Sequence, residues 1–585
     1  MNFIFGFYGK VIIISFFLYH FFTGSRLIKK EYVFSFFAIF FSLSYIFSPY
    51  WTAFHTRLYQ IICLIIFFLY GLSWSYLISE DLNIRKRIRT FWILVLGFLI
   101  YFINYRPLNA DIPWRGDESF HILLTMDLFS QIKNGSGFLI EDLLRYPYVQ
   151  KWLSLLFASP NLYTDIKLLR IIPFVSVLFI AIYLFYKFEE KLKKPILSLL
   201  FALSMVTAPL VYFYTSLLYL EMPIVFLMIV CIFDIKSILN LPYKEMLHRP
   251  QWYCLLLISF LKETAIIFLI LIALLRFIYQ IKINIKSSQL GKIIFSEIIL
   301  YFLLLSPMMI YLFFRNHFSI LNPYASQIDN ILDINYYLII IKSLFSQLGI
   351  LFVTGISGCF YLYAKKQQDI LIILSMMFVG IIFFFMINSP YIGYSRWNLF
   401  ILPIIIYSSF IFITSLNKIF RIVVLVFLLA SNVFLSPFLV DGTRLPNWGA
   451  PQADIAEYCY PYGRAVKFLS DNKSTKYLLL FGQYFPYNGL EFYLNKYNFH
   501  PEIIRYDLDR STRFDADTER LLLKNFFINT LPQKESKKEI LQIDTIIYHS
   551  VNNINLSTNE IYGNNFKISA KISNPFHSLY VFQKI

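Results

Sequence analysis

Ionisable residues gather in one short stretch of an otherwise apolar chain, the segment RGDESFH that begins at Arg115. A carboxylate such as Asp117 can accept the proton of an incoming hydroxyl group if its pKa lies near the working pH. On a helix, His121 shares a face with Asp117 because the two are four residues apart, whereas Glu118 points elsewhere. The two carboxylates are therefore predicted to do different jobs. A structural alternative stays open, in which Asp117 caps a helix and Glu118 lies at its positive end.

Four further ionisable residues border or interrupt apolar runs: Glu221 in YLEMP, Lys262 in SFLKETA, Arg396 in SRWNLF and Arg170 in RIIPFVSVLF. Lys262 and Arg396 together could neutralise a phosphate, the arginine through a bidentate fork and the lysine as a point charge. Arg170 is a further cationic candidate. Glu221 could be a metal ligand or an electrostatic partner. The structural alternatives are a solvated loop for Glu221 and snorkelling to lipid headgroups for the cations.

The composition is that of a membrane protein. Of the 585 residues, 58% are hydrophobic and 15% are charged, whereas soluble proteins carry about 25% charged residues. Apolar runs such as 196–214 and 370–387 are long enough to cross a hydrocarbon core about 30 Å thick. Much of the net charge of +17 lies in short loops between such runs. This is the positive-inside pattern, and it argues against nucleic acid as a partner.

The apolar runs predict an all-α polytopic membrane protein with about fourteen transmembrane helices. They are expected near residues 3–23, 32–49, 58–78, 91–105, 168–186, 196–214, 222–239, 252–263, 264–281, 293–315, 340–363, 369–387, 398–415 and 420–440. The two around Lys262 could instead be one long helix or a re-entrant pair.

The basic loops also predict a topology. With them on the cytoplasmic side, the outer side receives the loop 105–167, the turns at Glu221, Lys262 and Arg396, and the chain beyond Val440. The acidic and basic candidates should therefore meet at one face of the membrane.

Two amphipathic helices are expected in the outer loop, both lying at the membrane interface. In the first, Leu123 and Leu124 belong to an apolar stripe, and His121 and Thr125 lie away from it. The second covers residues 138–157.

Beyond residue 440 the chain becomes more polar and predicts a small extracytoplasmic α/β domain. Its expected helices are 462–470 and 488–497, and its expected strands are 476–481, 545–549 and 579–582. The predicted domains are N-terminal helices at 1–90, a transmembrane core at 91–440 and this domain at 441–585.

The ordered motifs resemble a known family. An acidic DE pair in the outer loop, then LLRIIPFVSVLF, YLEMP, LKETA and SRWNLFILP, resemble the C-type (GT-C) superfamily of integral-membrane glycosyltransferases. The resemblance is to the polyprenyl-phosphate-sugar-dependent branch, with protein O-mannosyltransferases and lipid A aminoarabinose transferases, and it covers residues 91–440. Two features depart from the family: the acidic loop follows the fourth predicted helix rather than the first, and Trp397 stands where relatives often have Tyr.

The resemblance implies a GT-C-like core and transfer of a single sugar, with inversion, from a polyprenyl-phosphate donor to a hydroxyl of an extracytoplasmic glycan, lipid or protein. It implies Asp117 as general base and Glu118 as a second catalytic acid that positions a substrate. It implies that Lys262 and Arg396 hold the donor phosphate and that Glu221 occupies a later acidic position. His121 and Arg170 are further candidates for substrate binding from their places in the sequence. A divalent metal ion is left open, with Glu221 as its candidate ligand.

Other functions remain as alternatives at this stage. A transporter or lipid flippase would also place charges within apolar spans, although no repeated halves are evident. A glycan polymerase or ligase would transfer whole chains, and a purely structural membrane protein would need none of these side chains. The expected location is the cell membrane of a bacterium, with membrane lipids around the chain.

Overall fold

The computed structural model describes about three fifths of the chain in eighteen stretches. These are residues 86–108, 121–127, 169–215, 221–247, 249–261, 265–284, 288–314, 334–388, 395–440, 462–472, 475–482, 487–507, 516–531, 543–550, 554–557, 560–563, 565–573 and 578–585. The three helices expected before residue 80 and the second loop helix at 138–157 lie outside them.

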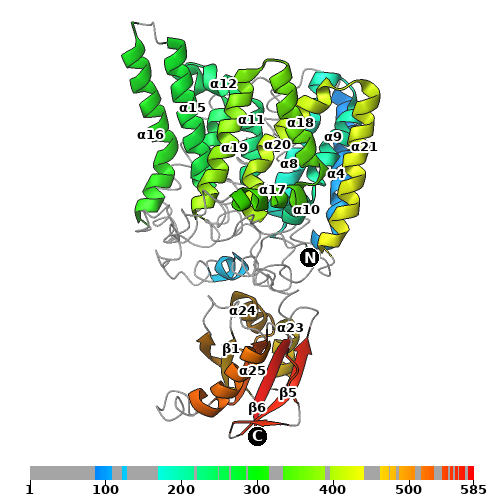
Figure 1. Ribbon diagram of the computed structural model, residues 1–585, viewed down its shortest axis with the longest axis vertical. Coiled ribbons are helices and arrows are strands. Elements are labelled where there is room, and N and C mark those ends of the chain that lie inside the picture. The colour runs from blue at the N-terminus through cyan, green and yellow to red at the C-terminus, as the bar shows by residue number, and fades with distance from the viewer. Residues whose placement is uncertain are drawn as a thin grey trace. The chain divides into compact units, whose positions relative to one another are not determined.

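The chain divides into two compact units. The first, here called the helical unit, comprises Met1–Asn109, Asp127–Ala158 and Leu169–Gly449. The second, the sheet unit, comprises Ala110–Met126, Ser159–Leu168 and Ala450–Ile585. The fold is thus mostly helical with a small C-terminal sheet (Figure 1).

The helical unit is a bundle of apolar helices. They are α4 (Lys86–Leu108), α8 (Ile171–Leu192), α9 (Pro195–Val206), α10 (Pro209–Thr215), α11 (Glu221–Phe233), α12 (Ile235–Asn240), α13 (Tyr243–Met246), α14 (Pro250–Leu261), α15 (Ile266–Asn284), α16 (Leu290–Phe314), α17 (Ile334–Leu348), α18 (Ile350–Ala364), α19 (Gln368–Asn388), α20 (Ser395–Ser415) and α21 (Lys418–Val440). Helix α11 is central, because every residue from Glu221 to Ile232 is buried.

The outer helices carry large apolar side chains that point away from the bundle. Phe102 of α4, Phe302 of α16, Phe360 of α18 and Ile419 of α21 are each at least 70% exposed. Exposure of so many large apolar groups would be costly in water but not in hydrocarbon. Three described helices, Ile171–Leu192, Ile266–Asn284 and Asn398–Ser415, are long and apolar enough to cross a membrane. The helical unit therefore has the surface of a membrane-embedded protein.

Three apolar runs that predict single helices are broken in the structure. The run 222–239 forms α11 and α12, which are separated by Asp234, and the other two runs break at a proline or a glycine. The run 196–214 forms α9 and α10, which are separated by Thr207 and Ala208 before Pro209. The run 340–363 lies in α17 and α18, which are separated by Gly349 with a positive φ of 56°. Proline lacks a donor for the preceding turn, and glycine tolerates positive φ, so each of these two breaks has a local cause.

Helices α18 and α20 approach each other very closely at two glycines. A Cβ atom added at Gly355 would lie 2.8 Å from Cγ2 of Ile405, and one added at Gly358 would overlap the carbonyl oxygen of Ser408. Next to this contact, the hydroxyls of Thr354 and Ser409 share a hydrogen bond of 2.9 Å. Small residues let the two backbones meet, which is how membrane helices usually pack.

Replacing Gly358 by Ala should therefore destabilise the helical unit, because the obstacle is backbone and cannot rotate away. We expect the free energy of unfolding to fall by about 1–3 kcal/mol, the usual range for overpacking. The fall should appear as a lower unfolding temperature in detergent. Gly291→Ala is the matched control, since nothing lies within 4 Å of its added Cβ. Equal unfolding temperatures for the two variants would contradict the close approach.

The sheet unit contains one mixed sheet of six strands. Its elements are α23 (Tyr462–Asn472), β1 (Tyr477–Gly482), α24 (Tyr487–Lys496), β2 (Glu502–Asp507), α25 (Ala516–Asn525), the π-helix η5 (Phe526–Thr530), β3 (Thr545–Ser550), β4 (Ile561–Tyr562), β5 (Phe566–Ser573) and β6 (Ser578–Lys584). The strand order is β2-β1-β3-β6-β5-β4, with β2, β1 and β3 parallel and the others antiparallel. Strand β3 is buried throughout, as expected of a central strand covered on both faces.

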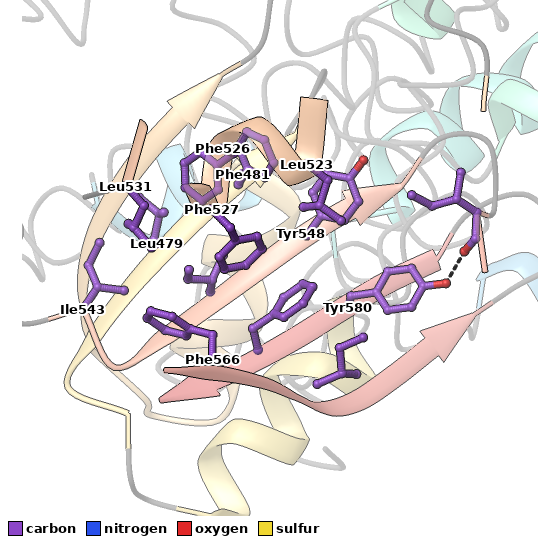
Figure 2. Packing of buried hydrophobic residues seen from close by; sticks show 14 residues of the cluster. Leu479, Phe481, Leu523, Phe526, Phe527, Leu531, Ile543, Tyr548, Phe566 and Tyr580 are labelled. Carbon is purple, nitrogen blue, oxygen red and sulfur yellow. Dashed lines mark hydrogen bonds between the residues drawn. The ribbon is translucent and has the colours of Figure 1, made fainter. Parts of the chain in front are cut away.

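One face of this sheet carries an aromatic core against α25 and η5 (Figure 2). The rings of Phe481 and Phe526 stack at 4.0 Å between centroids, and Phe527 lies 5.0 Å from Phe582. These contacts join strands β1 and β6 to the helical segment. Burial of such rings is the main source of stability for a domain of this size.

A carboxylate and a phenol are buried together at the edge of this core. The Tyr548 hydroxyl donates a hydrogen bond of 2.7 Å to Oε1 of Glu519, and both side chains are almost fully buried. Burial raises the pKa of Tyr548 well above its usual value, and the neighbouring Glu519 charge raises it further. Burial likewise raises the pKa of Tyr562 to about 12.

The stability of the sheet unit should consequently fall at high pH. An unfolded tyrosine ionises near pH 10, while folded Tyr548 stays protonated, so its contribution is complete below pH 10 and is lost above it. The expected slope is about 1.4 kcal/mol per pH unit from this group. The slope is measured by unfolding the full chain in urea at several pH values and monitoring cleavage within residues 450–585 by pulse proteolysis. Tyr548→Phe should flatten the slope, and an unchanged slope would contradict this origin.

Candidate functional site

The structure places the seven candidate residues in different parts of the chain. Asp117, Glu118 and Lys262 lie outside the described residues. Lys262 belongs to a short interval between α14 and α15, which are two separate helices.

The other four candidates lie on described helices. Arg170 occupies the N-cap position of α8, and Glu221 is the first residue of α11; both are completely buried. Arg396 is the second residue of α20. His121 belongs to the sheet unit and is also buried. Three of the four thus lie at the beginning of a helix of the helical unit.

Helices α8 and α11 run parallel and in contact. The ring of Phe226 lies 6.1 Å from Phe179 and 6.3 Å from Tyr183, and farther along Lys187 forms an ion pair of 3.5 Å with Asp234. At 1.5 Å per residue, these contacts put Arg170 about 6 Å, or roughly one turn, beyond the level of Glu221. The two buried charges therefore lie at the same end of the bundle.

Helix α20 runs parallel to both. Phe233, at the end of α11, lies 5.1 Å from Tyr407 and 5.1 Å from Phe410. From that level, Glu221 is about 18 Å back along the axis and Arg396 is about 17–21 Å back. The backbone of Arg396 consequently lies level with Glu221, and α10 packs against α8, α11 and α20.

The helix starts at this end of the bundle contribute positive electrostatic potential. Three parallel helices present their N-terminal ends, each equivalent to roughly half a positive charge. Buried Arg170 adds a positive charge beside the start of α8, where a cation is disfavoured, while buried Glu221 is favoured at the start of α11. The arrangement suits a phosphate group or another anion.

The described part of the outer-loop helix, residues 121–127, differs from the prediction. His121 and Thr125 were expected on the polar side of an amphipathic interfacial helix, away from the apolar stripe, but both are buried together with Leu123 and Leu124, so that side is not exposed. The Thr125 hydroxyl donates to the His121 carbonyl at 2.7 Å, which satisfies it within the helix. Residues up to Met126 belong to the sheet unit, so this helix is packed on both its polar and its apolar sides.

A polar network that the sequence prediction missed fixes the first turn of α20. Nδ2 of Asn398 donates to Oε1 of Gln347 at 2.8 Å and to the Ser343 hydroxyl at 3.0 Å, and Nε2 of Gln347 donates to that hydroxyl at 2.8 Å. Asn398 and Gln347 are buried. The network ties α17 to α20 two residues after Arg396. Polar amides within apolar runs, in SRWNLF and FSQLG, were the available signal.

Comparison with protein-family models and with curated proteins gave no match. Among solved structures, the chain is similar to the crystal structure of ArnT from Cupriavidus metallidurans bound to undecaprenyl phosphate, with 12% identity and a TM-score of 0.46. It is also similar to the same protein in the apo state, with 11% identity and a TM-score of 0.46. Each comparison covers 84% of this chain and 98% of the other chain.

A metal site at Glu221 would need further acidic, histidine or cysteine ligands close by. Among the described stretches, no three His, Cys, Asp or Glu side chains cluster as metal ligands would. A divalent ion held by Glu221 would need its other ligands from elsewhere in the chain, so this site stays a prediction.

Removal of the Asn398 amide should loosen the first turn of α20. Asn398→Ala leaves the buried Oε1 of Gln347 without this donor, which costs about 1–3 kcal/mol, measured as thermal unfolding in detergent. Changing Asn398 and Gln347 together to Leu should cost less than the sum of the single changes, because no buried group is then left unpaired. Lys342→Ala, at an exposed position of α17, is the control. Additive losses would show that the two amides are not coupled.

Proposed function

We propose that this protein is a GT-C-like integral-membrane glycosyltransferase that moves a single sugar from a polyprenyl-phosphate donor to a hydroxyl of an extracytoplasmic glycan, lipid or protein. The observation that supports the proposal is that α8, α11 and α20 begin at the same end of the bundle, with Arg170, Glu221 and Arg396 in or next to their first turns. The order of the DE, YLEMP, LKETA and SRWNLF motifs supports the same family.

The charge pattern fits the leaving group of this reaction. The acceptor oxygen attacks the anomeric carbon from the face opposite the phosphate, and the bond from that carbon to the phosphate oxygen breaks with inversion. The departing phosphate gains negative charge as the bond breaks. Arg170, Lys262 and Arg396 would stabilise that charge more in the transition state than in the donor, which is the condition for catalysis.

The acceptor must lose a proton during the same step. Asp117 is the proposed general base, and Glu118, a residue away on the same segment, positions the acceptor or donor. His121 would contribute to substrate binding from the same segment. Glu221, at the positive end of α11, would balance the arginines or ligate a divalent ion. A hydrophobic donor reaches such a site from within the bilayer, which explains why the cations lie at the end of apolar helices.

The proposal extends to the layout of the whole chain. Residues 91–440 would form the catalytic core, and together with residues 1–90 they would supply about fourteen transmembrane helices. The loop 105–167 and residues 441–585 would lie outside the cytoplasm. The host would be a bacterium, and the location its cell membrane.

The decisive variant is Asp117→Asn. It removes the proton acceptor but keeps the side-chain shape, so transfer from a polyprenyl-phosphate sugar should fall by at least about 100-fold, with an unchanged unfolding temperature. The measurement is the appearance of the glycosidic product, followed by mass spectrometry, with protein in lipid nanodiscs. Near-normal turnover would remove Asp117 from the mechanism.

Asp127→Asn is the matched control, because Asp127 is an exposed acid ten residues along the same segment. Its product formation should match that of the unchanged protein. Movement of substrate across vesicle membranes without a new glycosidic bond would instead indicate a transporter or flippase. A product extended by a whole glycan chain would indicate a polymerase or ligase.

A further inference from the structure

The break between α9 and α10 leaves backbone groups that cannot be satisfied within the helix. Pro209 has no N–H for the carbonyl of Met205. The Ala208 N–H, which would serve Ser204 in a continuous helix, instead donates to Met205 at 3.4 Å. The carbonyl of Ser204 is thereby released inside an apolar bundle, where an unsatisfied group costs several kcal/mol.

Asn432 of α21 supplies the missing donor. Its Nδ2 donates to the Ser204 carbonyl at 2.7 Å and lies 3.4 Å from the Thr207 hydroxyl. In return, the Ser204 hydroxyl donates to the carbonyl of Leu425 on α21 at 3.2 Å. Asn432 is completely buried, and its amide oxygen has no hydrogen-bond partner among the described residues. The amide is therefore used here as a donor to the broken helix.

The short helix after the break lies against every helix that begins at the candidate site. Helix α10 packs against α8, α11 and α20, and also against α17 and α21. Its Tyr212 hydroxyl donates to the carbonyl of Ile103 on α4 at 3.4 Å, and its last residues, Tyr214 and Thr215, are completely buried. Figure 1 shows α10 and α17 at the same end of the bundle. The direction of α10 thus sets the packing around the helix starts.

We propose that Pro209 and Asn432 are positioning residues: the proline turns α10 away from the axis of α9, and the asparagine holds the turned backbone so that α10 supports the starts of α8, α11 and α20. The inference rests on the proposed function for its catalytic consequence. Its structural part stands independently of the reaction. Polar side chains that repair a proline break are a general device of membrane helices.

The test uses Pro209→Ala in the full chain. Alanine restores an N–H for the Met205 carbonyl and favours a continuous helix, so the unfolding temperature should be equal or higher. Sugar transfer should nevertheless fall by about 10- to 100-fold, as a lower kcat with a smaller change in KM. A merely structural proline would give the gain in stability without the loss in kcat. Full activity in Pro209→Ala would overturn the proposal.

Asn432→Ala tests the partner residue. It should lower the unfolding temperature and speed amide hydrogen exchange in residues 207–215, because the Ser204 carbonyl loses its donor. Adding Pro209→Ala to Asn432→Ala should restore stability, since the continuous helix no longer needs that donor. Unchanged exchange in Asn432→Ala would overturn the role of Asn432.

Two controls separate these effects from general damage. Pro195→Ala changes a proline at the first turn of the same helix α9, where no donor is needed, and should leave stability and transfer unchanged. Val426→Ala changes a half-exposed side chain of α21 and should leave exchange in α10 unchanged. If the unmodified protein transfers no sugar, the proposed function fails, while the exchange and stability measurements still decide the positioning role.

Discussion

Charged groups inside an apolar bundle must be balanced, and this requirement governs the helical unit. Burying an ion away from water is costly unless a partner or an oriented dipole offsets it. Glu221 meets the condition at the positive end of α11, inside a helix that is buried along nearly its whole length. Helices α8 and α20 pack in parallel against α11 and begin at the same end of the bundle.

Breaks in the apolar helices follow the same requirement for backbone groups. At Pro209 the released Ser204 carbonyl is taken by Asn432. At Gly349 the chain turns into α18, and the preceding helix is tied to α20 through Gln347 and Asn398. Beside the first break, Asn432 links α21 to α9, and beside the second, Gln347 links α17 to α20. At these two breaks, buried amides thus supply hydrogen bonds next to the point where continuous helix geometry fails.

The sequence predicted the helical elements well wherever an apolar run was continuous. The expected helix 369–387 corresponds to α19, and strands at 476–481 and 545–549 correspond to β1 and β3. Hydropathy alone did not separate α9 from α10, because a single Pro209 hardly changes the mean of an apolar run. Strand β2 was missed, since its residues EIIRYD mix charged and apolar types. Partners such as Asn398 and Gln347 lie far apart in sequence, so only the packing reveals them.

Two arginines of the helical unit donate to backbone carbonyls at helix ends. Arg421 donates to the carbonyls of Ile413, Thr414 and Leu416 at the end of α20, and Arg276 donates to Leu241 while pairing with Glu297 at 2.7 Å.

Those two cations lie where helix carbonyls are negative, so each offsets charge that the backbone already presents. Arg170 lies at the opposite kind of end, where the backbone at the start of α8 is positive and adds to its charge. It shares that end of the bundle with the buried carboxylate of Glu221. The electrostatic balance there is therefore set by these two side chains together with the starts of the three parallel helices.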